Sequence, residues 1–392
     1  MYDLLIRDAT IVTSGGRQVA DVAIQRGRIR YVGPRPPRPN AKREIHAIGK
    51  FLMPGVVDTA ARFGARPTDD WGVESGAAVT GGITTAMALP APDSSVGDAE
   101  AKLARLARTS WCNYGLWGHA ASADLGELAR AIEAGLYIGA LASIGSESEA
   151  PVALEDLPSV LALPGLLGLQ LDVASGDKDT VTGLFDSLRG TSRATHLMHV
   201  STALELDLLD PLQGELSVTA GVTPHHLFLA SEEVGQAVKT HPPIRPEHDR
   251  RTLWTAVKRG RLDCVASDHH NNAQRGVPGA ELLFPLMLSA VKYGRLSLEL
   301  LVSLCAEAPA RVCGLESKGR IVKGADADLL LFSEGEVARV DESSLKSGAG
   351  WSPYLDREVA PKPEFVILGG EIVAQRGELV GKKPSGTHAL DR

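Results

Sequence analysis

Apolar residues at both ends of the chain recur in short runs whose spacing is typical of β-strands. Residues 2–12 are rich in apolar positions, and residues 20–32 read as a hairpin. A strand at 328–332 and a hairpin at 365–373 repeat this style near the C-terminus. Two similar ends around a different middle predict a small β-sandwich domain formed by both termini, followed by a loose polar tail at 381–392. The predicted small domain comprises residues 1–53 and 314–380.

Strand-like and helical segments alternate through the middle of the chain. Runs at 83–88 and 194–200 have the apolar character of buried strands, whereas 98–107 and 280–293 read as helices. Alternation of this kind over residues 54–313 predicts a (β/α)8 TIM-type barrel, a fold that typically takes about 250 residues.

The composition is that of an ordinary globular α/β protein, with 44% hydrophobic and 23% charged residues in a chain of 392. A net charge of −7 argues against nucleic acid or an anionic membrane as a main partner. The N-terminus does not read as a signal peptide, and no apolar run is long enough to span a bilayer, so we expect a cytoplasmic protein. The cysteines lack the CxxC pairing of zinc sites and are expected to be reduced core thiols. They are Cys112, Cys264, Cys305 and Cys313.

Polar residues directly follow several of the apolar strand-like runs. Asp58, His199, His225 and Asp268 all occupy such positions. Because barrel chemistry sits at the C-terminal ends of the strands, these side chains are expected at one barrel mouth.

Several blocks of the sequence resemble the cyclic amidohydrolases, and dihydroorotase most closely. They are residues 54–58, 72–85, 196–202, 222–229, 242–245, 263–269 and 319–332, in the order of the family. The resemblance implies a hydrolase that opens or closes a cyclic amide with one or two divalent metals, usually zinc. Histidines and carboxylates would hold the metal, and the metal would activate a water molecule. The carboxylate at the position of Asp268 would act as general base.

The same comparison shows that most of the expected metal ligands are replaced. Family members carry His-x-His after the first-strand aspartate, where this chain has Ala60 and Arg62. The bridging carboxylated lysine or aspartate would fall near Gln170, which carries no charge to bridge two cations. Asp172 lies nearby, but successive strand residues point to opposite faces. A further histidine is expected before His196, and residues 171–195 contain none.

The residues that contact substrate in the family are replaced as well. Gly64 stands where an arginine would grip the substrate carboxylate, and Ala91 where an asparagine would contact the substrate. His241 replaces the asparagine of an Asn-Pro-Pro motif. The ligand-type residues that survive are His199 and Asp268.

Two interpretations of Arg62 follow. It is either a built-in cation that replaces the metal and donates to Asp268, or a rim arginine that faces solvent. The first rests on charge balance, because arginine stays protonated and a buried carboxylate needs a partner.

The histidines leave alternatives open. His199 is a metal ligand, a surviving strand-end residue, or a core residue bonded to backbone. His225 and His226 read as structural, and at most one of them faces the pocket. His269 is more typical of loop packing than of ligation. A mononuclear zinc site on His199, Asp268 and a neighbour such as His225 or His269 is the alternative.

The resemblance therefore predicts a dihydroorotase-like barrel that has lost the binuclear zinc site. We expect no bound cofactor and a non-catalytic structural or regulatory role in pyrimidine biosynthesis, within a homo- or hetero-oligomer. Aspartate transcarbamoylase is the candidate partner that the resemblance implies. The alternatives are an active metal-dependent cyclic amidohydrolase with a rearranged, mononuclear zinc site, and a small-molecule binding module.

Overall fold

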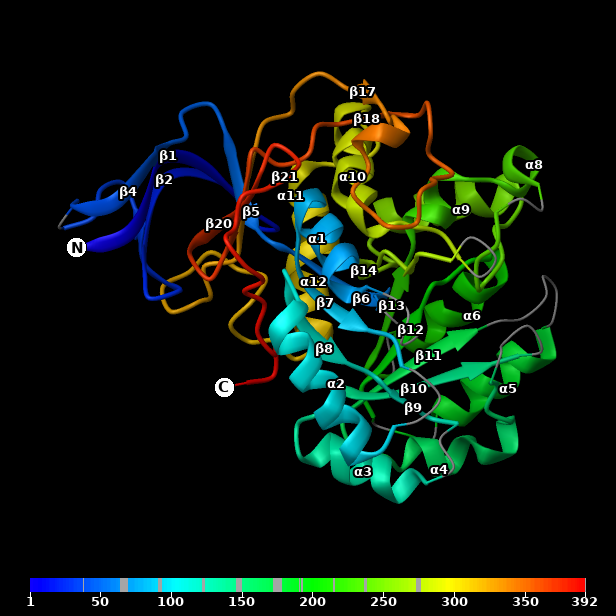
Figure 1. Cartoon of the computed structure of the whole chain (residues 1–392). Coiled ribbons are helices and arrows are strands. Elements are labelled where there is room, and N and C mark those ends of the chain that lie inside the picture. The colour runs from blue at the N-terminus through cyan, green and yellow to red at the C-terminus, as the bar shows by residue number, and fades with distance from the viewer. Residues whose placement is uncertain are drawn as a thin grey trace.

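The chain forms two structural units in its computed structural model. One is β-rich and is built from strands near both ends of the sequence, and the larger one alternates strands and helices (Figure 1). The structure describes residues 1–37, 39–63, 70–90, 94–121, 124–145, 150–171, 178–189, 191, 193–213, 216–235, 238–272 and 276–391. Within these ranges, no helix has the length and apolarity that crossing a bilayer requires. All four cysteines are free and buried.

The β-rich unit is a nine-stranded sheet in which N-terminal strands join C-terminal strands. Its order is β21-β20-β19-β16-β5-β1-β2-β3, and β4 pairs with β1. The N-terminal strands are β1 (Tyr2–Thr13), β2 (Gly16–Gln25), β3 (Arg28–Gly33), β4 (Ala41–His46) and β5 (Phe51–Pro54). The C-terminal strands are β16 (Leu329–Phe332), β19 (Phe365–Leu368), β20 (Glu371–Gln375) and β21 (Glu378–Leu379). The junction is the antiparallel pairing of β16 with β5.

Strand β16 shows why this sheet belongs to both units. Leu329 and Leu331 pack into the core of the small domain, with Ile6 and Val22. The alternate residues Leu330 and Phe332 pack into the main core of the barrel. A strand with two buried faces needs a continuous apolar run rather than strict alternation, and β16 is Leu-Leu-Leu-Phe.

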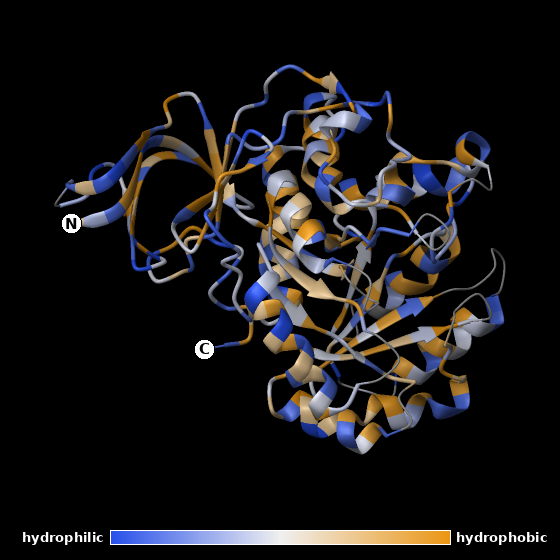
Figure 2. Ribbon diagram, in the orientation of Figure 1, coloured by the Kyte–Doolittle hydropathy of each residue, from blue (hydrophilic) through white to orange (hydrophobic). Residues whose placement is uncertain are grey.

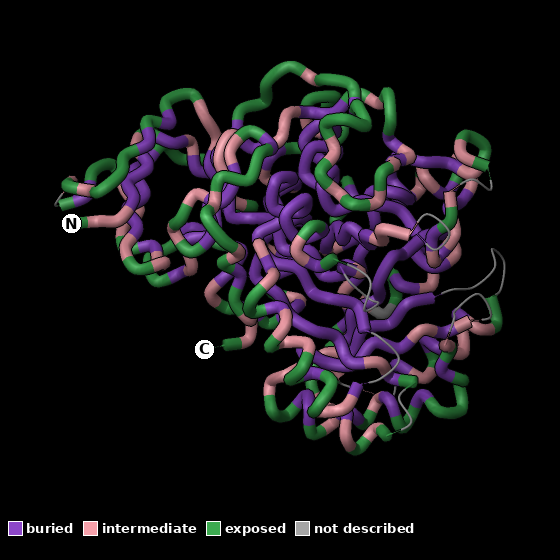
Figure 3. The backbone as a smooth tube through the Cα atoms, viewed as in Figure 1, coloured by how far each residue is buried: buried purple, intermediate pink, exposed green. Residues whose placement is uncertain are grey.

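The larger unit is a closed parallel barrel whose strands are largely buried, with exposed stretches on the outer helices (Figure 3). Its strands are β6 (Val56–Arg62), β7 (Ile83–Ala88), β8 (Asn113–Leu116), β9 (Gly118–His119), β10 (Gly139–Ile144), β11 (Leu166–Leu171), β12 (Thr195–Met198), β13 (Val218–Val222), β14 (Cys264–Val265) and β15 (His269–His270). Trp117 alone separates β8 from β9, and residues 266–268 separate β14 from β15, so these ten segments form eight strand positions.

Backbone hydrogen bonds cross both interruptions and close the barrel. The amide of Trp117 donates to Ala88 at 3.0 Å, and that of Asp268 donates to Ala60 at 3.0 Å. β15 then pairs in parallel with β6, so the last strand position lies beside the first.

The helices cover the outside of the barrel, and hydrophilic stretches lie along their outer surface (Figure 2). The longer ones are α1 (Trp71–Gly81), α2 (Val96–Thr109), α3 (Leu125–Glu133), α5 (Lys178–Arg189), α6 (Ala203–Gln213), α9 (Glu247–Lys258) and α10 (Leu283–Lys292). The shorter ones are α4 (Leu157–Leu161), α7 (Pro224–Phe228), α8 (Ser231–Val234), α11 (Leu298–Val302) and α12 (Ala308–Val312). Asp70 caps α1 by accepting from the amides of Gly72 and Val73.

The expectation of a loose tail is wrong for the part of 381–392 that the structure describes. The amide of Ala389 donates to Tyr114 at 2.7 Å, and the amide of Tyr114 donates to Thr387 at 3.0 Å. The Thr387 hydroxyl donates to Asn113 at 2.9 Å. The tail docks because β8 exposes unpaired backbone groups at its start, which the polar tail satisfies.

Candidate functional site

Three strand ends bring Arg62, His199 and Asp268 to the same end of the barrel. Arg62 is the last residue of β6, His199 directly follows β12, and Asp268 lies between β14 and β15. His199 is 1% exposed and Asp268 7% exposed, whereas Arg62 is half-buried. This end of the strands is where barrel enzymes hold their active sites.

His199 and Asp268 face each other in the mouth. The His199 Nδ1 lies 3.7 Å from the Asp268 Oδ2, which is beyond hydrogen-bond distance. Both residues have a left-handed backbone, with φ of 56° and 43°. Positive φ is uncommon outside glycine and costs of order 1–3 kcal/mol, and it gathers at functional sites.

Burial sets the protonation of this pair. It raises the pKa of Asp268 to about 7, although the charge of Arg62 acts in the opposite direction. It lowers the pKa of His199 to about 3, and Arg62 lowers it further. Near neutral pH the imidazole is therefore neutral and the carboxyl group is partly protonated.

Arg62 acts on the pair without contacting it. Its charge influences Asp268 and His199, and also Lys102 and His119. Across the described part of the chain, however, no direct ion pair joins the guanidinium to the Asp268 carboxylate. The expected hydrogen bond from Arg62 to Asp268 is thus absent among the described residues, and the half-buried Arg62 acts on the carboxyl group through its charge alone.

Lys102 is a second cation near the mouth, which the sequence did not single out. It lies on α2, half-buried. Burial lowers its pKa to about 8, and the charges of Arg105 and Arg62 act in the same direction. Lys102 and Arg62 therefore add positive charge to this side of the barrel.

His225 is held by Tyr354, which packs into the main core of the barrel. Its Nδ1 lies 2.7 Å from the hydroxyl of Tyr354, and the two rings stack with centroids 5.9 Å apart. Tyr354 lies between β16 and β19, 129 residues away in sequence, and both side chains are fully buried. The Nε2 has no hydrogen-bond partner among the described residues.

The other buried histidines have their own protein partners. His269 Nε2 lies 3.0 Å from the Glu74 Oε2, and its Nδ1 accepts from the Ala280 amide. His226 reaches Thr223 Oγ1 at 2.8 Å and two proline carbonyls at 3.2 Å. His196 contacts Thr219 Oγ1 at 2.9 Å. Of the five buried histidines in or below the mouth, His199 alone has both ring nitrogens without a hydrogen bond among the described residues.

Gln170 and His241 form another part of the mouth. Gln170 lies on β11, and its side-chain amide donates to the His241 carbonyl at 2.6 Å. The His241 Nδ1 is buried without a hydrogen-bond partner in the described ranges. Gln170 therefore anchors the loop that carries His241.

Strands β10 and β11 hold no ionisable side chain that could serve as the expected bridging ligand or further histidine. β11 pairs directly with β12, so no strand intervenes between Gln170 and His199. The preceding strand, β10, is Gly-Ala-Leu-Ala-Ser-Ile. Gln170 is thus the one long polar side chain on β10 and β11, and it carries no charge.

Asp58 has a structural task that its place in the motif did not reveal. It is fully buried and accepts hydrogen bonds from the Ser267 amide at 2.9 Å, the Ser267 hydroxyl at 2.5 Å and the Ala60 amide at 3.2 Å. Burial raises its pKa to about 6, against these three donors. Asp58 therefore fixes the segment that presents Asp268.

Among the described residues, the donor set lacks ligands that a pair of divalent ions would need. Ala60 offers no ligand atom, and Arg62 is a permanent cation. Within the described residues, no group of three or more histidine, cysteine or acidic side chains is arranged to hold a metal. Gly64, Ala91 and Asp172 lie outside the described residues.

Comparisons of sequence agree with this architecture. Residues 186–374 match the model of the Amidohydrolase family. An L-hydantoinase of Paenarthrobacter aurescens is 26% identical, over 100% of this chain and 99% of its own length. A dihydroorotase of Methanothermobacter thermautotrophicus is 27% identical (97% and 96% covered), and an allantoinase of Rubrobacter xylanophilus 28% (97% and 96%). These matches support a place for the chain in the cyclic amidohydrolase superfamily.

Solved structures confirm the predicted fold. An L-hydantoinase from Arthrobacter aurescens superposes with a TM-score of 0.92 at 24% identity, covering 99% of both chains. A dihydropyrimidinase from Brevibacillus agri gives 0.89 at 20% identity, covering 99% and 98%. The (β/α)8 barrel with a small β-sandwich domain is therefore the fold of this chain.

Proposed function

We propose that this relative of the cyclic amidohydrolases is a non-catalytic structural or regulatory subunit in pyrimidine biosynthesis. We choose this pathway because several of the relatives are dihydroorotases. The described part of the barrel places His199 and Asp268 in the mouth, with Ala60 and Arg62 at two positions where a binuclear site would need ligands. On this proposal the framework persists for assembly rather than for hydrolysis.

The place of Arg62 at the end of β6, half-buried beside the mouth, is the observation that carries the proposal. Its charge acts on Asp268 and His199, the two groups that a metal would need. A guanidinium stays protonated, so the charge of Arg62 would repel a divalent ion bound between His199 and Asp268. The positive charge that a metal would bring is supplied instead by the chain.

The proposed assembly is a defined homo- or hetero-oligomer with aspartate transcarbamoylase as first candidate partner. Co-expression followed by size-exclusion chromatography tests it. A complex that elutes with both chains supports the proposal. A lone monomer that leaves transcarbamoylase assembly unchanged counts against it.

An active hydrolase with a mononuclear zinc site is the second candidate. Two features favour it. Among the described residues, neither ring nitrogen of His199 has a hydrogen-bond partner, and its Nδ1 lies 3.7 Å from the Asp268 Oδ2. The His225 Nε2 has no hydrogen-bond partner there either. Both ring nitrogens of His226 are engaged, so that residue would not contribute.

A turnover assay separates the two candidates. Purified protein is offered dihydroorotate, hydantoin and allantoin in zinc-supplemented buffer, with Asp268→Ala as the matched control. The non-catalytic proposal predicts the same background rate for both proteins. Turnover that disappears in Asp268→Ala would replace it with the hydrolase.

A further inference from the structure

A surface segment between the last strands of the small domain is anchored in the barrel. We call it the strap; it comprises residues 340–357 and runs from β17 (Ala338–Arg339) to β18 (Glu358–Val359). These two short strands pair antiparallel, so the strap leaves and rejoins the fold at one place. Figure 1 shows it in orange next to α10. The strap is therefore a long excursion whose position depends on its contacts with the barrel.

Two buried carboxylates hold the first half of the strap. Glu281, just before α10, accepts from the amides of Lys346 at 2.8 Å and Ser347 at 3.1 Å. Glu74, on α1, accepts from the Ser347 hydroxyl at 2.7 Å and the Gly348 amide at 3.0 Å. Glu74 is 1% exposed and Glu281 3% exposed. Hydrogen bonds to buried carboxylates are strong, so the strap is firmly seated on the barrel.

Glu74 also connects the strap to the mouth. The same oxygen that accepts from Ser347, Oε2, lies 3.0 Å from the His269 Nε2. His269 directly follows Asp268 in the chain, and its ring packs edge-on against Phe63 with centroids 5.0 Å apart. The strap therefore shares one carboxylate oxygen with the segment that presents Asp268.

The second half of the strap reaches the same segment through another histidine. Tyr354 is fully buried, and its hydroxyl lies 2.7 Å from the His225 Nδ1. The backbone of Gly279 packs against the His225 ring, since a Cβ there would lie 2.8 Å from its Cε1. The same Cβ would lie 2.6 Å from the carbonyl oxygen of Ser267, the residue before Asp268. A chain of close contacts thus joins Tyr354 to Ser267.

We propose that the strap is a control element for the mouth. Seated, it fixes residues 267–269 from two sides; displaced, it releases them and with them the carboxyl group of Asp268. Coupling of this kind needs an unbroken path of packed or hydrogen-bonded groups, and both anchors provide one. Because such coupling is reciprocal, a ligand that moves the strap would change the mouth, and a ligand of the mouth would change the strap. The inference goes beyond the proposed function, since it holds whether or not the mouth is catalytic.

Hydrogen–deuterium exchange followed by mass spectrometry tests this link on the full chain. The amides of Asp268 and His270 report on the mouth segment, because each donates to a backbone carbonyl elsewhere in the barrel, at 3.0 and 2.9 Å. Ser347→Ala removes the hydroxyl that donates to Glu74 and changes no residue of the barrel. Both amides should then exchange about tenfold faster, the effect of losing one hydrogen bond to a charged group.

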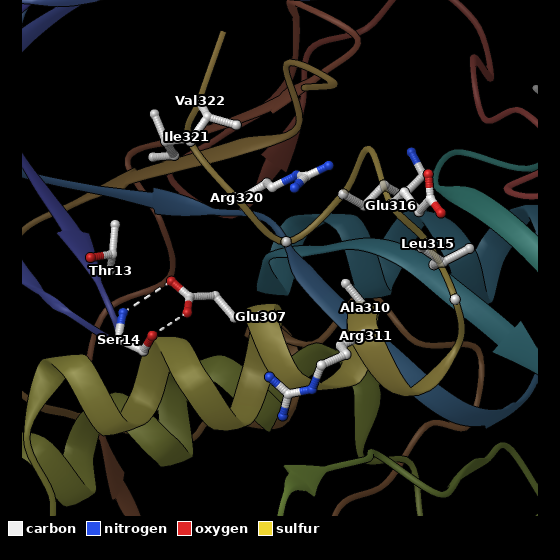
Figure 4. Close-up of a pocket in the computed structure, with 13 residues that line it drawn as sticks. Thr13, Ser14, Glu307, Ala310, Arg311, Leu315, Glu316, Arg320, Ile321 and Val322 are labelled. Carbon is white, nitrogen blue, oxygen red and sulfur yellow. Dashed lines mark hydrogen bonds between the residues drawn. The ribbon is translucent and has the colours of Figure 1, made fainter. Parts of the chain in front are cut away.

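Ser14→Ala is the matched control, because it also removes a serine hydroxyl that donates to a glutamate. Its acceptor is Glu307, at the wall of a cavity between the small domain and the last helices of the barrel (Figure 4). The lining of this cavity comes from residues 13–14 and 307–322, outside the strap. Exchange of the two mouth amides should therefore be the same in Ser14→Ala as in the wild-type protein.

Tyr354→Phe tests the second anchor. It removes the hydroxyl beside His225 and should also raise exchange of the Asp268 and His270 amides. Tyr2→Phe, on β1 of the small domain, is its control and should leave them unchanged. A rise in a strap variant that its control lacks supports the proposal. Unchanged mouth amides in both strap variants, or a rise of equal size in the controls or throughout the barrel strands, would overturn it.

Discussion

The imidazole of His199 approaches the carboxyl group of Asp268 to 3.7 Å, and both residues do so from a left-handed backbone. Each follows a different strand, so the approach is fixed by the barrel rather than by local sequence. Asp58 adds to it by holding Ser267, the neighbour of Asp268. The mouth thus keeps a strained pair in place, with Ala60 and Arg62 at positions where two further ligands were expected.

Replacing Arg62 is expected to change the mouth's protonation more than the stability of the fold. Because the guanidinium is half-buried and makes no contact ion pair among the described residues, Arg62→Gln should cost less than about 1 kcal/mol of unfolding free energy. The coupling between Arg62 and Asp268 in a double-mutant cycle should also stay below about 1 kcal/mol. Urea unfolding measures both. A coupling of several kcal/mol would show that the two side chains form a contact pair.

Asp268 is expected to make the protein less stable as pH rises from about 4 to 7. Burial raises its folded pKa to about 7, above the value near 4 of an unfolded aspartate, so the folded state binds the extra proton in this window. Asp268→Asn should therefore be more stable than the wild-type protein at pH 8, by an amount on the order of 2–4 kcal/mol. The gain should shrink toward pH 4.

Urea unfolding at pH 5 and pH 8 checks this sign. The exposed Asp207 provides the control, because Asp207→Asn should shift both values equally. An Asp268→Asn variant that loses stability at pH 8 would mean that the charged carboxylate has a stabilising partner in solution.

Tyr354 is expected to stabilise His225 from outside the barrel. Tyr354→Phe removes the hydroxyl 2.7 Å from the His225 Nδ1 and leaves a buried ring nitrogen without a partner. The expected cost is about 1–3 kcal/mol of unfolding free energy. Tyr293→Phe is the control, since that hydroxyl contacts Glu358 at the surface. Equal effects of the two changes would contradict a specific role for the buried contact.

The sequence predicted the fold well because the fold depends on repeated patterns. Strand β16, with two buried faces, and the alternation of β6 to β14 with helices are visible as apolar runs. The tail was mispredicted because its partner, β8, lies more than 270 residues away.

The site was predicted only in part, for a similar reason. His199 and Asp268 follow apolar runs, so their meeting was foreseeable. The side-chain direction of Arg62 was not, since a single strand-end residue can turn to the rim or to the pocket. Tyr354 and Lys102 carry no local signal, because their roles arise from packing between segments distant in sequence.

Metal content shows whether the mouth still holds zinc. The protein is expressed with added zinc, dialysed, and analysed for bound elements, alongside a variant carrying Ala60→His and Arg62→His. We expect far less than one ion per wild-type chain, because Arg62 opposes a cation and the described residues hold no complete donor set. We also expect higher retention in the double histidine variant. A stoichiometric pair of zinc ions held by the wild-type chain through dialysis would show that the mouth is a working binuclear site.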